Sequence, residues 1–254
     1  MSVKTIFITG ASAGFGEACS RAFAAEGHRL VLTARRDEKL KRLRDELAGT
    51  ASVHIVTLDV RDREAVESAV ASLPADFRDI DVLVNNAGLA LGLEPAHQVA
   101  IEDWDVMVDT NIKGLMYCTR TILPGMVERN RGHIVNISST AASWPYPGGN
   151  VYGGTKAFVS QFSRNLRADL LGTRVRVTCI QPGMAETEFS KVRFKGDDDK
   201  AGQVYAGTQP LTAFDIAETV TWVVNRPAHV NINSLEVMSV DQAWGPFAIN
   251  RQKR

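Results

Sequence analysis

The chain has 254 residues, a length that suits one large domain or two small ones. Apolar residues make up 44% of it and charged residues 23%, which favours a packed core over disorder. Lysine plus arginine and aspartate plus glutamate each total 29, so bulk charge predicts neither a nucleic-acid partner nor a membrane-surface partner. With no signal peptide pattern and no apolar run near the roughly 18 residues of a membrane span, we expect a soluble cytoplasmic protein.

The cysteines and histidines predict neither a disulfide framework nor a metal site. Cys19, Cys118 and Cys179 are widely spaced in apolar surroundings, so we expect buried, reduced thiols. The five histidines are scattered along the chain, and we expect no bound metal.

Apolar runs rich in β-formers alternate with helical patterns from one end of the chain to the other. The strands are predicted at residues 5–9, 30–34, 53–59, 81–88, 132–139, 175–183 and 234–240. The helices are predicted from the end of the first loop to about Glu26 and then at 37–48, 62–72, 101–129, 150–171 and 212–224.

The predicted strands are continuous apolar runs, which is typical of strands buried on both faces of a parallel sheet. Their alternation with helices predicts the α/β class. We expect residues 1–254 to form one Rossmann-fold domain, a doubly wound parallel sheet of about seven strands with helices on both faces. Residues 190–209 are polar and long enough to form a substrate lid, and residues 244–254 form a C-terminal tail.

A glycine-rich loop, TGASAGFG at residues 9–16, separates the first predicted strand from a helix. Gly10, Gly14 and Gly16 let backbone N–H groups approach a pyrophosphate, which the helix dipole also favours. The spacing G-x-x-x-G-x-G differs from the more familiar G-x-G-x-x-G. We therefore predict a dinucleotide site mainly from the position of the loop, which directly follows the first strand.

The end of the second predicted strand indicates which dinucleotide is bound. Folds that bind NAD usually place an acid there for the ribose 2′-hydroxyl. Here the strand ends in Arg35 and Arg36, and no acid comes before Asp37. A guanidinium pairs with a 2′-phosphate through bidentate charged hydrogen bonds, and Ser12 can add a hydroxyl. The sequence thus predicts NADP(H), with Arg35 ranked above Arg36.

The stretch NVYGGTKAF, residues 150–158, places Tyr152 and Lys156 one helical turn apart. A free tyrosine has a pKa near 10, too high for a general base at neutral pH. Because a neighbouring cation favours the phenolate, we expect Lys156 to lower the pKa of Tyr152. The phenol can then exchange a proton with an alcohol or a carbonyl. Gly153 and Gly154 are poor helix formers, and we expect them to leave space for the cofactor ribose and the substrate.

Taken together, these motifs resemble the short-chain dehydrogenase/reductase family. The resemblance covers nearly the whole chain and rests on TGASAGFG at 9–16, Asp59-Val60, NNAG at 85–88, Asn111, Ser139, Tyr152-x-x-x-Lys156 and Pro182-Gly183. Within it, NVYGGTKAFVSQFSRNLRADLLGTRVRVT, TEFSKVRFKGDD and PAHVNINSLEVM look like the NADP-dependent 3-hydroxy-acid dehydrogenase branch, to which bacterial sulfoacetaldehyde reductases are similar.

The resemblance implies roles for individual residues and a homotetramer or dimer. Catalysis is assigned to Ser139, which polarises the substrate oxygen, to Tyr152 and Lys156, and to Asn111, which supports a water relay to the lysine. The end of the fifth strand is also where open α/β sheets place ligands, and the resemblance picks Ser139 there over Ser138. The cofactor contacts implied are the loop residues Gly10, Ser12, Gly14, Phe15 and Gly16, then Arg35, Arg36, Asp59, Val60, Asn86, Ala87, Gly88, Tyr152, Lys156, Pro182, Gly183 and Thr187.

Three features suggest a small anionic carbonyl substrate. Arg193 and Lys195 lie in the expected lid, and Arg193 is the expected anion binder because a guanidinium suits a carboxylate or sulfonate. Trp144 and the segment 145–150, PYPGGN, are expected to form a rigid wall beside Tyr152. The tail adds further aromatic and basic residues, namely Trp244, Phe247, Arg251, Lys253 and Arg254.

One departure from the hydroxy-acid branch decides the preferred substrate. The loop PGMAETEFS is one residue shorter than the branch pattern and carries Glu186 where a glycine is expected. We therefore predict reduction of sulfoacetaldehyde to isethionate with NADPH. The alternative is an NADP-dependent 3-hydroxy-acid dehydrogenase that acts on serine, allo-threonine or 3-hydroxypropionate/malonate semialdehyde. A catalytically silent dinucleotide sensor and a sugar or steroid dehydrogenase are further hypotheses, which assays with neutral alcohols would test.

Overall fold

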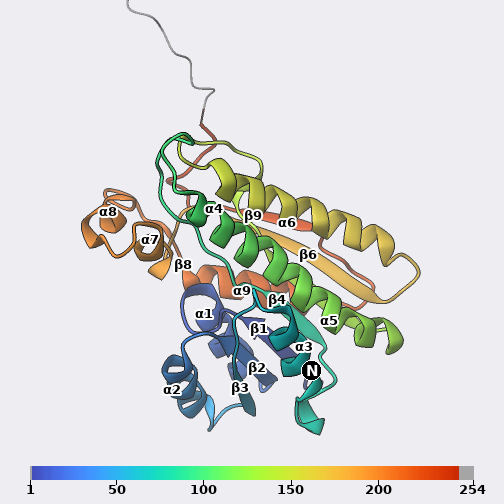
Figure 1. The fold of residues 1–254 in the computed structure, drawn as a ribbon. Coiled ribbons are helices and arrows are strands. Elements are labelled where there is room, and N and C mark those ends of the chain that lie inside the picture. Colours follow the sequence, from blue (N-terminus) through green and yellow to red (C-terminus); the bar gives the residue numbers. More distant parts are fainter. Residues whose placement is uncertain (1, 246–254) are drawn as a thin grey trace, which may run out of the picture.

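The structure, a computed structural model, describes residues 2–245 and is built around a parallel sheet (Figure 1). The seven strands of this sheet are β1 Thr5–Thr9, β2 Arg29–Ala34, β3 Val53–Thr57, β4 Val82–Asn85, β5 Gly132–Ile137, β6 Val175–Pro182 and β9 Ser234–Val237. From edge to edge they follow the order β3-β2-β1-β4-β5-β6-β9, and every neighbouring pair is parallel. The predicted α/β class and doubly wound sheet are confirmed.

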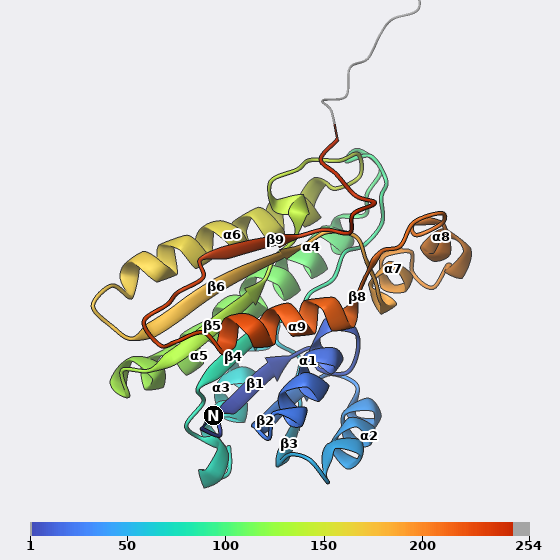
Figure 2. The same ribbon diagram turned by 180° about the vertical axis from the view of Figure 1, so that it is seen from behind.

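Helices cover both faces of the sheet, as predicted. They are α1 Gly14–Ala25, α2 Asp37–Leu47, α3 Arg63–Ala71, α4 Ile101–Val108, α5 Leu115–Glu128, α6 Asn150–Asp169, α7 Glu188–Arg193, α8 Asp198–Gln203 and α9 Ala213–Val224. Helices α1, α2 and α9 pack on one face, and α3, α5 and α6 pack on the other (Figures 1 and 2). Within residues 2–245, none of the helices is long and apolar enough to span a membrane.

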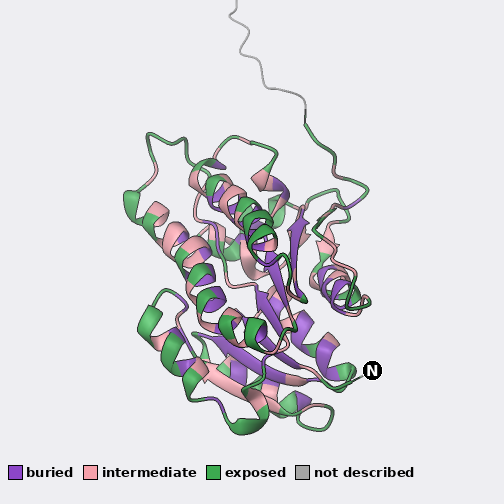
Figure 3. Cartoon of the chain, turned by 90° about the vertical axis from the view of Figure 1, so that its right-hand side faces the viewer, coloured by how far each residue is buried: buried purple, intermediate pink, exposed green. Residues whose placement is uncertain are grey.

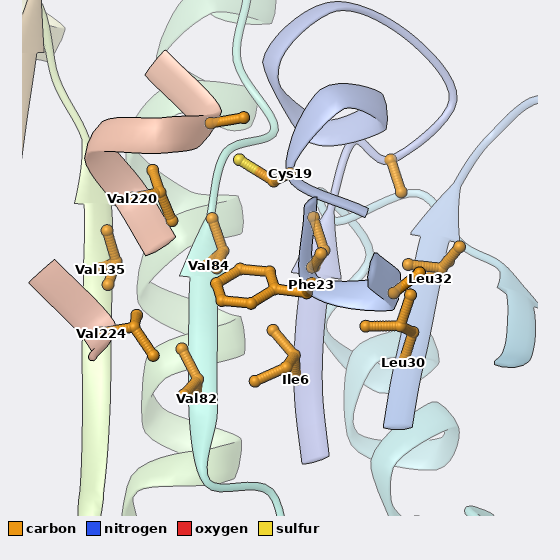
Figure 4. Packing of buried hydrophobic residues seen from close by; sticks show 14 of the residues in the cluster. Ile6, Cys19, Phe23, Leu30, Leu32, Val82, Val84, Val135, Val220 and Val224 are labelled. Carbon is orange, nitrogen blue, oxygen red and sulfur yellow. The ribbon is translucent and has the colours of Figure 1, made fainter. Parts of the chain in front are cut away.

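Each face of the sheet has its own hydrophobic core, because successive strand residues point to opposite sides. In β1, Ile6 and Ile8 belong to the core under α1 and α9, and Phe7 belongs to the core under α3 and α5. In the first core, the ring of Phe23 lies beside Ile6 and Val84 (Figure 4). The central strands are buried while the helices keep an exposed side, which explains the continuous apolar runs of those strands (Figure 3). The edge strands β3 and β9 are more exposed.

The strand order places a cleft at the carboxyl ends of β1 and β4. The chain builds outward from β1 through β2 to β3, then returns to place β4 on the other side of β1. The connections after β1 and β4 therefore leave in opposite directions. Ligands in open α/β sheets bind at such a switch point.

The long helix expected at 101–129 is divided into two helices by a π-helical turn. This turn covers Asp109–Gly114 and carries Asn111, which is 2% exposed, into the interior. A π-turn inserts one extra residue into the helical repeat and often occurs at functional sites. The apolar periodicity of the sequence continues across it, so the pattern predicted one uninterrupted helix.

The segment predicted as a lid contains two short helices, α7 and α8, followed by a small two-stranded sheet contact. Strand β7 Ala185–Glu186, just before the lid, pairs in parallel with β8 Leu211–Thr212, just after it. Capping side chains begin both helices, because Thr187 accepts from the N–H of Phe189 and Asp197 accepts from that of Lys200. Such short polar helices have too few turns to show an apolar period, so the sequence pattern did not predict them.

Replacement of Phe23 by alanine should destabilise the fold. Its ring is fully buried, and removal of a buried phenylalanine ring costs about 3–5 kcal/mol because a cavity remains. Urea unfolding of Phe23→Ala should show a loss of that size. The matched control is Leu171→Ala at a side chain that is 80% exposed, where we expect a change within about 0.5 kcal/mol. Equal losses in the two variants would contradict the described core.

Candidate active site

A cavity of about 1140 Å³ lies at the carboxyl ends of the strands and gathers most of the predicted site residues. The loop after β1, the ends of β2, β4, β5 and β6, and helices α6 and α7 all contribute to its lining. The predicted residues that line it are Gly10, Ser12, Gly14, Phe15, Arg35, Arg36, Asp59, Val60, Asn86, Ala87, Gly88, Ser139, Trp144, Tyr152, Lys156, Pro182, Gly183, Thr187 and Arg193. Gly16 and Asn111 lie behind this lining.

The shape of the glycine loop depends on two residues with a left-handed backbone conformation and on one close contact. Gly10 has a φ of +67° and Gly14 a φ of +55°, conformations that side-chain-bearing residues rarely adopt. Gly16 packs so tightly against the carbonyl of Gly10 that a Cβ atom would clash with it. The N-cap residue of α1, Ala13, has no capping side chain, so backbone N–H groups at this helix end lack a side-chain acceptor among residues 2–245.

The NNAG segment holds the glycine loop from the neighbouring strand. The side chain of Asn86 donates to the carbonyls of Thr9 at 2.8 Å and Gly10 at 3.2 Å. The N–H groups of Asn86 and Ala87 both donate to the Thr9 hydroxyl, at 3.0 and 2.9 Å. These contacts give Asn86 and Ala87 a structural role in shaping the loop.

Arg36, which the sequence ranked second, makes the more specific contacts at the end of β2. Its Nε donates to the Ser12 hydroxyl at 3.1 Å, and Nη1 donates to Glu188 on α7 at 2.8 Å. The other oxygen of Glu188 accepts from Lys39 at 2.6 Å, and both bonds lower the pKa of Glu188, Lys39 more than Arg36. Arg35 lines the same cavity without a side-chain hydrogen bond to any described residue.

Asp59 and Val60, which were predicted as cofactor contacts, follow β3, and the segment after β6 lies against the glycine loop. Asp59 accepts from Arg61 at 2.6 Å, which lowers the pKa of its carboxyl, and Val60 is 7% exposed. Thr187 lies against Gly14 and caps α7 with its hydroxyl, which accepts from Phe189 at 3.1 Å.

Ser139, Tyr152 and Lys156 meet where β5 ends and α6 begins. The Ser139 hydroxyl accepts from the N–H of Ala141 at 3.1 Å and points to the carbonyl of Pro182 at 3.4 Å. Lys156 is 5% exposed and donates from Nζ to the carbonyl of Ile137 at 3.0 Å. Its Nζ atom lies 5.8 Å from the centre of the Tyr152 ring, so the predicted one-turn spacing does bring the two groups together.

The expected fall in the Tyr152 pKa is wrong for the described geometry. Burial is the largest cause and raises the pKa of Tyr152 to about 12, although a hydrogen bond from Ser139 and the charge of Arg193 both lower it. Burial also lowers the pKa of Lys156 to about 8. The helical spacing could not show that both groups lie out of water, where each resists becoming charged.

The two glycines between Tyr152 and Lys156 do not line the cavity, so the predicted role in cofactor access is not supported. A Cβ atom on Gly153 would lie 3.1 Å from the carbonyl of Ala141, in the 3-10 turn Thr140–Ala142. Gly154 is exposed and has no atom within 4 Å of its Cβ position. The absent side chain therefore serves close packing at Gly153, and at Gly154 nothing in the structure requires a glycine.

Asn111 is fully hydrogen-bonded by its neighbours behind the cavity wall. Its Oδ1 accepts from the N–H of Leu89 at 2.9 Å, and its Nδ2 donates to the carbonyl of Leu89 at 2.8 Å and to the Thr155 hydroxyl at 3.0 Å. Asn111 thus links the segment after β4 to α6 at Thr155, which is next to Lys156 in the sequence. The predicted water relay stays a prediction.

Arg193 brings a cation to the face of the Tyr152 ring. The guanidinium carbon lies 5.1 Å from the centre of that ring and 5.2 Å from the centre of the Phe189 ring. Nη2 donates to the Tyr146 hydroxyl at 2.8 Å, and Nε is buried with no hydrogen-bond partner among residues 2–245. The sequence pattern did not single out Tyr146 and Phe189 as partners of Arg193, although PYPGGN was predicted as a wall here.

The remaining residues predicted for the substrate site are Lys195, Trp144 and the tail, and Lys195 does not line the cavity. Lys195 is outside the cavity lining and pairs with Asp103 at 2.8 Å. Trp144 lines the cavity, and its ring lies 5.4 Å from that of Trp244, the first tail residue. Residues 246–254, with the remaining predicted basic residues of the tail, lie outside the described residues. Within residues 2–245, no group of three or more His, Cys, Asp or Glu side chains has a metal-binding arrangement.

Glu186 does not reach the cavity, which removes the basis for the predicted sulfonate preference. It is exposed in β7, where it pairs with Thr212 of β8, while its neighbours Ala185 and Thr187 line the cavity. A two-residue strand turns successive side chains to opposite sides, so Glu186 faces away from the site.

Comparison with known proteins identifies the family. The family model for short chain dehydrogenases matches residues 4–198. The chain belongs to the short-chain dehydrogenase family. Among curated relatives, this dehydrogenase is 62% identical over 247 residues to the NADP-dependent 3-hydroxy acid dehydrogenase YdfG of Salmonella typhi, covering 97% of this chain and 99% of the relative. It is 53% identical to serine 3-dehydrogenase of Agrobacterium fabrum, covering 98% of each chain.

Solved structures give the same result. The closed form of serine dehydrogenase complexed with NADP+ is 59% identical, with a TM-score of 0.94 and coverage of 97% of this chain and 99% of the other. The crystal structure of serine dehydrogenase from Escherichia coli is 54% identical, with a TM-score of 0.82 and coverage of 94% and 99%. This chain therefore has a higher TM-score with the closed complex than with the Escherichia coli structure.

Replacement of Lys156 by methionine should stabilise the fold at neutral pH. Burial lowers the pKa of Lys156 to about 8, so below that pH the folded chain holds an ammonium that burial disfavours. This cost fades as pH rises from about 8 to the pKa of an unfolded lysine, because only the unfolded state then binds the extra proton. We expect Lys156→Met to gain on the order of 2 kcal/mol at pH 7 and much less at pH 10.

Thermal or urea unfolding at both pH values measures this effect. Arg164→Met, on the exposed side of the same helix, is the control and should change stability little at either pH. A loss of stability at pH 7 in Lys156→Met would show that the bond to the Ile137 carbonyl outweighs the cost of the buried charge.

Proposed function

We propose that this chain is an NADP(H)-dependent oxidoreductase that interconverts a small 3-hydroxy acid and its 3-oxo acid. The observation that carries the proposal is Arg193, whose guanidinium lies 5.1 Å from the Tyr152 ring centre in the cavity that Ser139 and Lys156 also line. Serine, allo-threonine and 3-hydroxypropionate are the substrates we expect. The relatives named above, which are 3-hydroxy acid and serine dehydrogenases, support this class.

The residues at the carboxyl ends of β1 and β2 fit a phosphorylated dinucleotide. The left-handed glycines and the uncapped end of α1 suit the pyrophosphate, and Arg36 with Ser12 presents donors suited to a 2′-phosphate. Arg35 adds a second guanidinium. When bound there, NADP(H) supplies or accepts the hydride. The remaining contacts we propose are Phe15, Asp59, Val60, Asn86, Ala87, Gly88, Pro182, Gly183 and Thr187.

The reaction needs one proton to move at the Tyr152 hydroxyl. In oxidation the tyrosine oxygen takes the proton of the substrate hydroxyl, and in reduction it returns that proton to the carbonyl oxygen. Ser139 orients the substrate oxygen by a hydrogen bond. Lys156 holds positive charge 5.8 Å from the tyrosine ring centre, which favours the phenolate that accepts the proton in oxidation and that remains after proton donation in reduction.

The position and charge of Arg193 suit a substrate that is short and anionic. A 3-hydroxy acid has one carbon between its carboxylate and its carbinol carbon, so an anion site must lie close to the phenol. Arg193 satisfies this requirement, and among the described residues its Nε donor has no hydrogen-bond partner. Trp144 lines the same cavity.

Sulfoacetaldehyde has the same spacing between its sulfonate and its aldehyde, so geometry alone does not separate the two substrates. The curated relatives favour the hydroxy-acid alternative, and Glu186, on which the sulfonate prediction rested, faces away from the cavity. We therefore place sulfoacetaldehyde second. A lid at residues 190–209, a substrate contact from the tail, a homotetramer and a cytoplasmic location complete the proposal.

NADPH consumption should test the substrate class directly. Malonate semialdehyde should be reduced with NADPH at least about 10-fold more efficiently, in kcat/KM, than sulfoacetaldehyde, and NADH should replace NADPH poorly. Serine and 3-hydroxypropionate should be oxidised with NADP+ in the reverse direction. A clear preference for sulfoacetaldehyde would restore the sulfonate hypothesis, and turnover of neutral alcohols alone would refute both.

Arg36→Ala should selectively weaken the use of NADPH. Loss of a guanidinium that pairs with the 2′-phosphate removes about 1.5–3 kcal/mol of charged hydrogen bonding, or about 10- to 100-fold in KM for NADPH. The KM for NADH should change little, because NADH has no 2′-phosphate. Arg42→Ala, on the exposed side of α2, is the matched control. Equal effects on NADPH and NADH would assign Arg36 to loop structure instead.

A further inference from the structure

Arg193 has a second feature besides its suitability for an anion, which is its position over the catalytic phenol. Its guanidinium carbon lies 5.1 Å from the ring centre of Tyr152, closer than Lys156 Nζ at 5.8 Å. Tyr152 itself is 8% exposed, so water screens neither cation strongly. A cation over the ring is attracted more strongly by a phenolate than by a phenol, because the phenolate carries a full negative charge.

We propose that Arg193 is an activating residue for Tyr152, which stabilises the phenolate form directly in addition to binding the substrate anion. This inference rests on the proposed function, in which Tyr152 exchanges the proton. It assigns to the lid helix α7 a part in the proton-transfer chemistry as well as in substrate binding.

Of the two cations that face Tyr152, Arg193 is the one that keeps its charge at mildly alkaline pH. The charged or titratable groups that face the phenol are Lys156 from its own helix, Arg193 from α7, and Tyr146 from the loop before α6, together with the Ser139 hydroxyl at the end of β5. Burial lowers the pKa of Lys156 to about 8, so this amine loses its charge at mildly alkaline pH. Arginine stays protonated throughout this range.

Several contacts hold the guanidinium in place over the ring. The Tyr146 hydroxyl accepts from Nη2 at 2.8 Å, and the backbone carbonyl of Arg193 accepts from the N–H of Gly92 at 2.9 Å. Ser190, on the same helix, is bonded to the Tyr205 hydroxyl at 2.6 Å, and that hydroxyl donates to the carbonyl of Ala185 at 3.0 Å. The end of α7 is therefore anchored to the loop after β4 and to the base of the lid.

The consequence is a coupling between the position of α7 and the acidity of Tyr152. With α7 docked, the charge of Arg193 lowers the pKa of Tyr152, opposing the rise that burial causes. If α7 moves away, burial still raises the pKa of Tyr152, but the charge of Arg193 no longer lowers it. The proton acceptor is thus strongest when the lid covers the substrate.

A neutral substrate separates activation from anion binding. We would measure NADP+-dependent oxidation of 3-hydroxypropionate and of its uncharged amide, 3-hydroxypropanamide, with the full-length enzyme, from pH 6 up to the highest pH at which circular dichroism shows the fold retained. In Arg193→Gln the apparent pKa of the kcat profile for the amide should rise by about one unit, since an opposite charge at this distance shifts a pKa by about that much. Arg193→Lys keeps a cation and should recover most of the shift.

The control is Lys191→Gln, which removes a cation from the same helix at an exposed position outside the cavity lining. Its pH profile should match that of the unaltered enzyme. If Arg193→Gln raises KM for 3-hydroxypropionate but leaves the pH profile for the amide unchanged, Arg193 only binds the anion and the inference is wrong. Circular dichroism of each variant verifies that the fold is retained.

A titration without substrate keeps this inference separate from the proposed substrate class. Ultraviolet absorbance of tyrosinate is followed with pH in the unaltered enzyme and in Arg193→Gln, and the signal of Tyr152 is isolated by subtracting the matching Tyr152→Phe variant. A higher pKa of Tyr152 in Arg193→Gln supports the inference even if no 3-hydroxy acid is turned over. An identical pKa overturns it even if the substrate class is correct.

Discussion

Parallel pairing on both sides of β1 is the constraint on which the rest of the molecule depends. Parallel strands need crossover connections, and these place helices on both faces of the sheet and bury its central strands. The same geometry brings every carboxyl end to one edge. Residues as distant in sequence as Gly10, Asn86, Ser139 and Gly183 therefore line one cavity, although no local interaction joins them.

Burial at that edge disfavours the charged forms of both Tyr152 and Lys156, and neighbouring polar and charged groups partly offset this effect for Tyr152. A phenol and an amine removed from water both favour their neutral forms, and proton transfer requires at least one of them to change charge. Ser139 and Arg193 approach the phenol from two different elements and favour its charged form, and the Lys156 amine lies 5.8 Å from the ring centre on the helix of Tyr152 itself. In the proposed mechanism, the chemistry depends on where α7 lies as much as on the Tyr–Lys pair within α6.

The segment after β6 has a similar double role on the cofactor side. Thr187 lies against the glycine loop, and Glu188 joins Arg36 and Lys39, so the start of α7 touches both the loop after β1 and the end of β2. A few residues later the same helix presents Arg193 to the phenol. One short helix therefore contacts the proposed cofactor site and the proposed substrate site, which links the two regions mechanically.

The sequence by itself determined the approximate places of the strands along the chain, the fold class, the glycine loop, the one-turn spacing of Tyr152 and Lys156, and hence the family. These features are local, because periodicity, capping and motif spacing depend on residues near one another in the chain. Most predicted site residues accordingly line the cavity.

Only the tertiary structure decided the direction of the Tyr152 pKa, the contacts of Arg36, the outward face of Glu186, the packing role of Gly153 and the place of Arg193 over the phenol. Each of these depends on burial or on a distance between segments far apart in sequence. Desolvation and Coulomb interaction act through space, so no pattern along the chain could specify them.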